Sequence, residues 1–492
     1  MLMVSLMLVA AAGITTMAAD TTSQEAPAVI SLEEALEIAL SNNPSVRIAD
    51  KEIERTQYAR KGAYAALFPQ INASGSYQRT IKKQVMYMGG DSDDEEGGGG
   101  GMAGMLSGIL EPVMYYIDQL YQGTGVPLVP YVNPNPAGAS SSDGGIEVGR
   151  WNTFNGGISA SMPLINAQLW KSISITGDDV DLAVEKARSS RLEMVNQVKQ
   201  AYYSVLLAKE ANQVFQSVFD NAVQNLELTQ KKYNASKASE LDLARAKTTV
   251  ANAVPNLYDS ANSIDLALWQ LKALMGVDLS AEIDVKDSLL VYAGAMGSEE
   301  FGTDLSGNSS LRQLNIQADQ LAKSIRMQQY GYLPTLALSF SFSMNAMTND
   351  FNFSEYKWTP YSFVGLSLNI PIFSGGQKHN NIRQAQVQAS ELAIQRENAE
   401  RQLQIAIRQS LSTMQTAVKS HESAEEALES ARKAYDIAAK SYAVGRSTLT
   451  DLDAAQLALT QAELSASQAV YNYLVAKAGL ESTIGADYET AE

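Results

Sequence analysis

Few residues of this chain belong to types that carry out catalytic chemistry. It contains no cysteine, which excludes disulfides, thiolate metal sites and a cysteine nucleophile. Its two histidines, His379 and His421, lie far apart in helical sequence and argue against a zinc site or a serine-type triad. The sequence also lacks a phosphate-binding loop and a nucleophile elbow. These observations predict a protein that is not an enzyme and holds no metal or cofactor.

Acidic side chains are the more numerous candidates for a binding site. The formal net charge is −17, which argues against nucleic acid as a partner, because phosphate binding needs basic patches. The acidic run at residues 91–96 could suggest calcium, but it lacks the ligand spacing of a calcium-binding loop. We interpret it as part of a solvated loop. Asp242 and Asp451 each follow a serine or threonine by three positions, which is typical of a capping box at a helix start.

The elements that position these residues are very long helices. From about residue 379 to residue 442, neither proline nor glycine interrupts the sequence. At 1.5 Å per residue, such a helix is roughly 90 Å long. Small residues recur along it at alternating spacings of three and four, from Ile382 to Ser441, as in the seam of a coiled coil. The capping-box spacing at Ser31 and at Ser310 predicts two further helix starts.

Strands are few and long. Residues 335–347 and 361–373 each alternate apolar and small or polar side chains with period two. Each half of the chain supplies two such strands, which makes four in all. Four strands cannot close a barrel around an interior, and unpaired strand edges are not tolerated in lipid. If these strands face lipid, the barrel must therefore be shared between chains.

Landmarks in the two halves of the chain repeat in register. Pro69 and Pro334 each precede a strand, whereas Pro163 and Pro371 each end the next strand and direct the chain into a long helix. The offset between Pro163 and Pro371 is 208 positions, and the turns after the long helices repeat at an offset of 209. The fold class is therefore mainly α with a membrane β-barrel contribution, built from a duplicated unit of two β-strands and long coiled-coil helices.

The duplication predicts the domain organisation. Residues 1–19 are apolar and end in small residues, as in a secretory signal peptide, although a buried N-terminal helix is the alternative. The first repeat spans 20–300 and contains N-terminal helices, a strand pair with an acidic and glycine-rich loop insertion at about 83–149, and a long helical hairpin. The second repeat spans 301–485 with the same elements, and 486–492 form a C-terminal tail.

Four segments, taken together, resemble the TolC-type outer-membrane efflux family (the outer membrane factors). They are the helix start from Ser31 to Pro44, the Tyr332-Leu-Pro334 segment before a strand, the Pro371-Ile-Phe-Ser-Gly-Gly376 segment after one, and the turn that begins at Tyr442-x-x-Gly445. The resemblance covers nearly the whole chain after the signal region. No single segment is diagnostic, but their order, spacing and duplication are specific.

The resemblance implies a homotrimer in which three chains form a 12-stranded barrel in outer-membrane lipid and an α-helical tunnel across the periplasm. It implies a passive exit channel of a tripartite efflux or type I secretion system. The partners would be a periplasmic adaptor protein and an inner-membrane pump of the RND, ABC or MFS type. The alternative is a periplasmic coiled-coil adaptor or scaffold, but such proteins typically carry one helical hairpin and not two.

The resemblance also implies a periplasmic gate where the helical hairpins turn. Family members narrow the pore there with a ring of acids and hold it shut with tyrosine and arginine contacts. Asp451 matches the first acid of the family turn, and Asp453 is one position early for the second. Tyr442 and Arg446 match the contact-forming residues, with Arg446 displaced by one position.

In the first repeat, Tyr233 and Asp242 occupy the equivalent positions, but the turn lacks the glycine found as Gly445 in the second repeat. The alternative role for both aspartates is helix capping alone, because a carboxylate three positions into a helix accepts hydrogen bonds from backbone amides and interacts favourably with the helix dipole. Both roles are compatible at Asp451. The cargo and the class of pump are not determined by the sequence.

Overall fold

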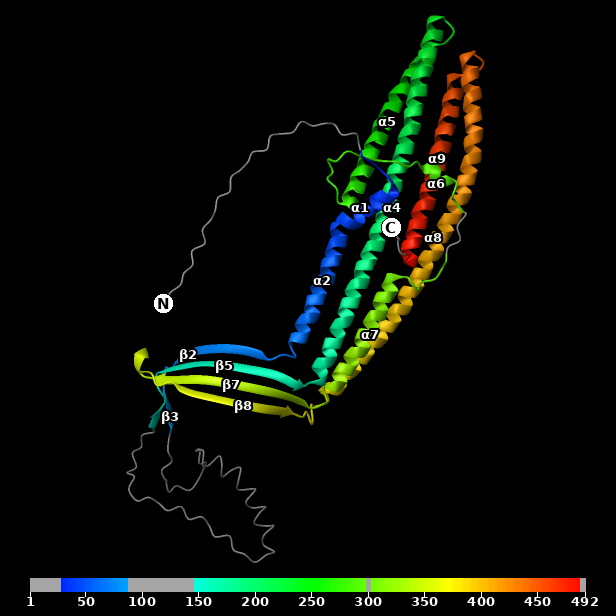
Figure 1. Cartoon of the computed structure of the whole chain (residues 1–492). Helices are drawn as coiled ribbons and strands as arrows, with labels where there is room; N and C mark the ends of the chain where they lie inside the picture. The colour runs from blue at the N-terminus through cyan, green and yellow to red at the C-terminus, as the bar shows by residue number, and fades with distance from the viewer. Residues whose placement is uncertain (1–27, 87–145, 298–301, 487–492) are drawn as a thin grey trace, which may run out of the picture. The chain divides into compact units, whose positions relative to one another are not determined.

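The computed structural model describes residues 28–86, 146–297 and 302–486 (Figure 1). Contacts within the chain divide it into two compact units, and each unit draws on both sequence halves. The helical unit comprises the described residues of 1–63, 167–332 and 373–492, and the sheet unit those of 64–166 and 333–372. The predicted signal peptide, most of the predicted loop insertion and nearly all of the C-terminal tail lie outside the described residues.

Two long hairpins dominate the helical unit. Helix α4 (Ala167–Asn234) pairs with α5 (Glu240–Met275), and α8 (Gln377–Ala443) pairs with α9 (Leu449–Ile484). With 68 and 67 residues, α4 and α8 are each about 100 Å long. Helix α4 packs on both α5 and α9, which joins the hairpins into one layer of helices (Figure 1). The expectation of very long paired helices is confirmed.

Shorter elements pack around the ends of α5 and α9 and along the remaining parts of α4 and α8. They are β1 (Ala28–Ile30), α1 (Leu32–Asn42), α2 (Pro44–Ala65), β6 (Ile283–Val285), α6 (Leu289–Ala293) and α7 (Ser309–Tyr330). Strands β1 and β6 pair in parallel. The main hydrophobic core lies here, where large side chains such as Tyr202, Leu206, Leu271 and Met275 are fully buried. Elsewhere many of the buried residues of the hairpins are small, such as Ala246 and Ala253 of α5 and Ala462 and Ala469 of α9.

Three helices begin with the capping boxes that the sequence predicts. The N-caps are Ser31 for α1, Ser239 for α5 and Thr448 for α9. The helix start predicted at Ser310 is found one residue earlier, at Ser309 of α7. The predicted cap is wrong, because the N-cap is Asn308, whose side chain accepts a hydrogen bond from the amide of Leu311. Asn308 is preferred because its amide group also donates to the carbonyl of Thr483, at 2.7 Å, and so serves a tertiary contact.

The seam along α8 follows the predicted spacing only in part. Ala385, Leu392, Ala417 and Ala424 lie on the predicted seam and are buried. Ile407 and Met414 are also buried but lie one position beyond it. The physical reason is that α8 packs against α7 as well as against α9, so different sides of the helix are covered along its length.

The sheet unit is an antiparallel four-stranded sheet with the order β2-β5-β7-β8. The strands are β2 (Gln70–Arg79), β5 (Asn152–Ile165), β7 (Thr335–Thr348) and β8 (Thr359–Asn369). The unit also contains a separate short antiparallel pair, β3 (Gln84–Met86) and β4 (Ile146–Val148), and a 3-10 turn, η1 (Phe353–Glu355). Strand β8 begins two residues earlier than predicted and ends four residues earlier.

The strand register separates an apolar face from a polar face. One cross-strand row on the apolar face consists of Ile71, Ala160, Phe340 and Val364. A row on the opposite face consists of Ser76, Asn155, Asn345 and Thr359. Tyr361 and Phe363 of β8 are aromatic exceptions on the polar face, with ring centroids 5.8 Å apart. The apolar residues remain largely exposed in the single chain, since Ile71 and Val364 are 71% and 70% exposed.

Among the helices of the described residues, none combines the length and the apolar character that a membrane span requires.

Candidate functional site

The predicted gate lies at the two hairpin turns, whose backbones are nearly identical. After α8, the amide of Gly445 donates to the carbonyl of Tyr442 and that of Arg446 to the carbonyl of Ser441. After α4, Ser236 and Lys237 make the equivalent two bonds, to Tyr233 and Lys232. Both turns need one residue with a positive φ angle, which is 80° at Gly445 and 59° at Ser236. Ser236 thus adopts a backbone conformation that costs an L-residue free energy.

Ser236→Gly is therefore expected to stabilise the first turn by about 1 kcal/mol, because glycine adopts a positive φ without steric cost. The matched control is Gly445→Ser, where a Cβ would meet no atom within 4 Å, so that only the backbone conformation is penalised. Hydrogen exchange at the amides of Lys237 and Arg446 measures the two local stabilities. A shift of the same sign in both variants would contradict the backbone explanation.

Asp242 and Asp451 both complete capping boxes. The Asp451 carboxylate accepts hydrogen bonds from the Thr448 hydroxyl, at 2.7 Å, and from the Thr448 amide, at 3.0 Å. Asp242 accepts from the hydroxyl and amide of Ser239, at 2.7 and 3.1 Å. These hydrogen bonds, first of all those from the hydroxyls, lower the pKa of both carboxyl groups. Both aspartates are therefore anionic at neutral pH, and Asp451 is exposed.

Tyr442 joins the two hairpins of one chain. Its side chain is only 5% exposed, and its hydroxyl lies 2.6 Å from Oγ1 of Thr229 on α4. The Nζ atom of Lys232, also on α4, lies 3.8 Å from the centroid of the tyrosine ring and donates to the tyrosine carbonyl. Burial lowers the pKa of Lys232. We call Thr229, Lys232 and Tyr442 the tip clasp.

Asp453 also lies between the hairpins. Burial raises the pKa of its carboxyl group, and the positive charge of Arg245 on α5 opposes that shift. The Arg245 guanidinium also donates to Oγ1 of Thr450, at 3.3 Å. Asp453 is thus a half-buried packing residue within the chain.

The structure brings Tyr442 and Asp453 into the contact between the hairpins, while Tyr233 and Arg446 are exposed at the turns. Thr229, Lys232 and Arg245 were not among the residues predicted from the sequence. The local signal was the pair of basic residues in the last turn of α4, Lys231 and Lys232, where the helix dipole favours a cation. The contact of these residues with α8 and α9 depends on how the hairpins pack.

The four junction prolines lie at or near strand ends. Pro69 and Pro334 each precede a strand by one residue, and Pro371 follows β8 by two residues. Pro163 differs, because it lies inside β5 opposite Ala337, two residues before the strand ends. The register shifts between Pro163 and Ile165, which is how a strand accommodates a residue that has no amide proton.

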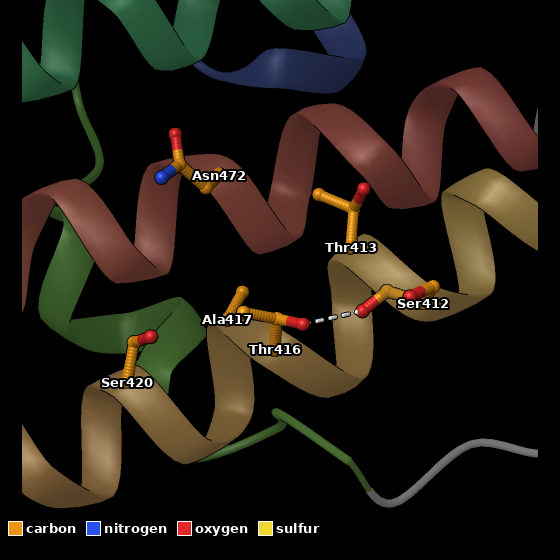
Figure 2. A pocket seen from close by; sticks show the side chains of 6 residues that line it. All are labelled: Ser412, Thr413, Thr416, Ala417, Ser420 and Asn472. Carbon is orange, nitrogen blue, oxygen red and sulfur yellow. Dashed lines mark hydrogen bonds between the residues drawn. The ribbon is translucent and has the colours of Figure 1, made fainter.

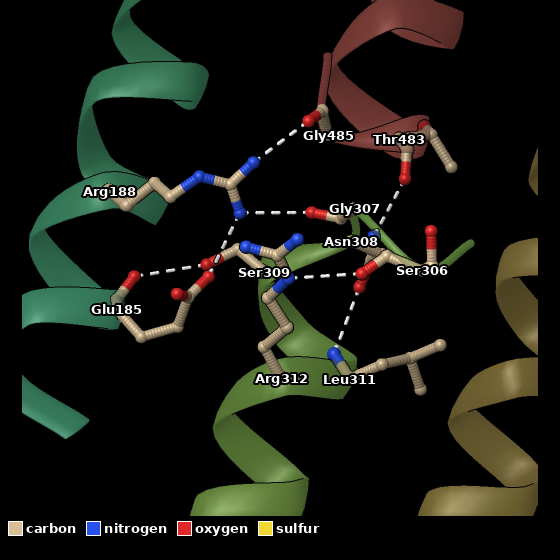
Figure 3. Close-up of polar contacts among 10 residues, drawn as sticks. All are labelled: Glu185, Arg188, Ser306, Gly307, Asn308, Ser309, Leu311, Arg312, Thr483 and Gly485. Atoms are coloured by element: carbon tan, nitrogen blue, oxygen red, sulfur yellow. Dashed lines mark hydrogen bonds and ion pairs between the residues drawn. The ribbon is translucent and has the colours of Figure 1, made fainter. Parts of the chain in front are cut away.

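A polar joint connects α4, the start of α7 and the end of α9 (Figure 3). The Arg188 guanidinium donates to the carbonyls of Gly307 and Gly485, both at 2.9 Å, and pairs with Glu185. A Cβ on Gly307 would lie 2.8 Å from the carbonyl oxygen of Ile484, so the two backbones meet too closely for a side chain. This joint anchors the second hairpin far from its turn.

Several hollows lie along the helices in the described part of the chain, and two of them lie between the helices of the hairpins. The first, of about 200 Å³, is lined by hydroxyl groups of α8 and by Asn472 of α9, without a titratable side chain (Figure 2). The second, of about 340 Å³, is lined by Glu210, Glu463, His421 and Arg432, among others. Across the described residues, no three acidic or histidine side chains converge as they would around a metal ion.

Glu210→Gln tests the electrostatics of the second hollow. Burial raises the pKa of Glu210 above its ordinary value of 4.5, so the unfolded chain releases this proton first as the pH rises. The contribution of Glu210 to folding stability therefore falls as the pH rises above about 4.5. At pH 7.5 the variant is expected to raise the free energy of unfolding, by less than about 1 kcal/mol because the group is partly solvated. Below pH 4.5 it is expected to have no effect. Glu227→Gln, an exposed site on α4, should have no effect at either pH.

Comparisons with known proteins agree with this geometry. The sequence model of the family "Outer membrane efflux protein" matches residues 125–277 and 303–486. Outer membrane protein TolC of Escherichia coli (strain K12) is 22% identical over 360 residues, which cover 68% of this chain and 70% of TolC. The alkaline protease secretion protein AprF of Pseudomonas aeruginosa is 23% identical over 208 residues, 42% of this chain and 43% of AprF. The crystal structure of the Campylobacter jejuni CmeC outer membrane channel superimposes with a TM-score of 0.67 at 16% identity, over 94% of this chain and 87% of CmeC.

The four-stranded sheet and the two long hairpins give the chain the fold of the CmeC channel. Together with the family model and TolC, this defines the class of protein as an outer-membrane exit channel. The chain belongs to the outer membrane efflux protein family, whose model matches well over half of it. It is an outer-membrane protein whose helical part lies in the periplasm. The family is one of channels and not a class of enzymes.

Proposed function

We propose that three copies of this chain assemble into one exit duct with a 12-stranded barrel and a continuous helical tunnel. The sheet carries this proposal. Its outer strands β2 and β8 each pair on one side only within the described residues, and both are exposed along nearly their whole length. Unpaired backbone groups are costly in lipid, and four strands are too few to close on themselves.

The faces of the sheet support the same assembly. In barrels of the outer membrane, apolar side chains face lipid while polar side chains face the lumen. The row containing Phe340 and Val364 suits lipid, and the row containing Asn155 and Asn345 suits a water-filled lumen. The alternative, a periplasmic adaptor, would expose this apolar face to water, so the sheet favours the membrane duct.

We further propose that the duct receives cargo from an inner-membrane pump through a periplasmic adaptor. The names of the relatives support two uses, since the family is named for efflux and AprF for protease secretion. The choice among RND, ABC and MFS pumps stays open. Purifying the chain from its native membrane under mild detergent, followed by mass spectrometry of the proteins that accompany it, identifies the pump.

At the hairpin turns, we propose that three copies of Asp451 form a cation-attracting ring, with Asp242, Tyr233 and Arg446 near it. The support is the exposure and the lowered pKa of Asp451, which keep a negative charge at the tip. Rings of carboxylates in other pores select cations in this way. Asp453 is a weaker candidate for the ring, because it is half-buried beside Arg245.

Single-channel recording in planar bilayers tests both parts of this proposal. Asp451→Asn keeps an oxygen acceptor for the capping box but removes the charge, and it is expected to weaken block by divalent cations about tenfold or more. Asp242→Asn removes the same charge from the other capping box and is expected to weaken the block less, because Asp242 is proposed to lie beside the ring and not in it. Unchanged block in Asp451→Asn would exclude the acid ring. A chain that is monomeric by light scattering and forms no channels would exclude the duct itself.

A further inference from the structure

The edge strands β2 and β8 can be assigned a pairing register between one copy of the chain and the next. Strand β2 belongs to the first repeat and begins after Pro69, whereas β7 begins after Pro334, an offset of 265 positions. Strand β5 contains Pro163, and β8 is followed by Pro371, an offset of 208 positions. Each residue of β2 therefore has a counterpart on β7, 265 positions later, and each residue of β5 up to Ser161 has a counterpart on β8, 208 positions later.

The observed pairing inside each repeat obeys these two offsets. In the first repeat Gln70 faces Ser161. Adding 265 to the first number and 208 to the second gives Thr335 and Asn369, which face each other in the second repeat. The two hairpins are thus built in one register, although their sequences differ and their loops have different lengths.

The junction between the repeats supplies the pairing that the open edges lack. There β5 of the first repeat meets β7 of the second, and Ser159 faces Ser341. The counterpart of Ser159 is Ser367 on β8, and the counterpart of Ser341 is Ser76 on β2. Applied to a second copy of the chain, the same junction places Ser367 opposite the partner subunit's Ser76.

We propose that β8 of one copy pairs with β2 of the next in this register, with Ser367 opposite the partner subunit's Ser76. The interface partner is thus a second copy of the chain, and the pairing rests on the proposed assembly of three copies. The neighbouring pairs are Leu366 opposite the partner subunit's Tyr77 and Leu368 opposite the partner subunit's Gly75.

The faces of the sheet provide an independent check. Leu366 and Leu368 lie on the apolar face of β8, and Tyr77 and Gly75 lie on the apolar face of β2, in the rows of Phe154 and Gly156. A register displaced by one residue would place polar residues against lipid. The proposed register keeps one apolar face and one polar face around the whole barrel.

The register also advances evenly around the barrel. Within one chain, Gln70 faces Ser161, Ser161 faces Ser339 and Ser339 faces Gly365. The proposed pairing places Gly365 opposite the partner subunit's Gln78, eight positions beyond the starting residue. Half of this advance occurs within each repeat. Ser339, reached after the first repeat, is the counterpart of Ser74, which lies four positions beyond Gln70. Closure of a barrel requires a fixed stagger, and here all six repeats contribute equally to it.

Cysteine cross-linking tests this register directly, because the natural chain has no cysteine. The double variant Ser76→Cys with Ser367→Cys, expressed in its membrane and oxidised with copper phenanthroline, is expected to yield covalent dimers and trimers. The comparison variants keep Ser367→Cys but move the second cysteine two residues along the same face, to Ser74→Cys or Gln78→Cys. A two-residue shift displaces the Cα atoms by about 6.8 Å, which is beyond the reach of a disulfide. Their yield is expected to be at least about fivefold lower.

The positive control is Ser159→Cys with Ser341→Cys, the observed counterpart pair, which should form a disulfide within one chain. Dominant cross-linking through Ser74→Cys or Gln78→Cys would overturn the register while leaving the assembly intact. The assembly and the register would both be overturned if the positive control cross-links while no variant forms a bond between chains and the protein has a monomeric mass.

Discussion

Tyr442→Ala should give a channel that stays open, with a conductance in planar bilayers raised severalfold over that of the natural chain. Tyr442 is 5% exposed and closes the tip clasp between the two hairpins. Truncating a buried aromatic residue to alanine typically costs about 3–5 kcal/mol. Here the loss falls on the contact between α8 and α4, so the hairpins are free to separate at their turns.

Two controls separate the clasp from general damage. Tyr442→Phe keeps the ring under Lys232 but loses the hydroxyl contact with Thr229, so it should have an intermediate effect, about 1 kcal/mol. Tyr233→Ala truncates the counterpart tyrosine in the first turn, which is 39% exposed and should open the channel less. Equal conductance in the Tyr442→Ala and Tyr233→Ala variants would refute a special role for the clasp.

The cation over the Tyr442 ring can be isolated with a double-mutant cycle. Lys232→Met keeps a long apolar side chain but removes the charge. Combined with Tyr442→Leu, it should reveal a coupling free energy of about 1 kcal/mol, because the two groups are in direct contact. Additive effects on the opening equilibrium would mean that Lys232 acts independently of the ring.

Leu366→Lys should prevent stable insertion of the barrel, whereas Ser367→Lys at the next position should be tolerated. The two residues are neighbours on β8 and point to opposite faces, Leu366 to the apolar face and Ser367 to the polar face. A lysine on the lipid face of a barrel near the bilayer midplane costs about 2–4 kcal/mol per chain. Three copies of the change would therefore remove much of the stability of the assembly.

Urea unfolding in lipid vesicles measures this difference, and the resistance of the assembled oligomer to heating in detergent provides a second measurement. Ser367→Arg serves as a control for the size of the introduced cation. If Leu366→Lys and Ser367→Lys destabilise the oligomer equally, the assignment of the two faces to lipid and lumen is wrong.

Local sequence signals predicted the long helices, the long strands and most of the helix starts. A long stretch without proline or glycine predicted α8, the repeat in the sequence predicted its counterpart α4, and strict alternation predicted β7 and β8. Ser31, Ser239 and Thr448 were predicted as N-caps, because a capping box is made by residues three positions apart. Features of this kind depend on neighbours in the sequence, and a single chain therefore reveals them.

Features that depend on distant contacts were missed or misplaced. The cap of α7 is Asn308 and not Ser310, because Asn308 also binds the end of α9. Pro163 lies inside β5, because pairing with β7 continues past it. The buried positions of α8 drift off the predicted seam, because the helix packs against more than one neighbour along its length.

The tip shows the division most clearly. By itself, the sequence determined that two equivalent turns exist, each with a tyrosine before it and a capping aspartate after it. Only the tertiary structure decided that Tyr442 is buried against Thr229 and Lys232 while Tyr233 stays exposed. The physical reason is that the two hairpins of a chain meet on one side only, so that equivalent residues acquire different neighbours.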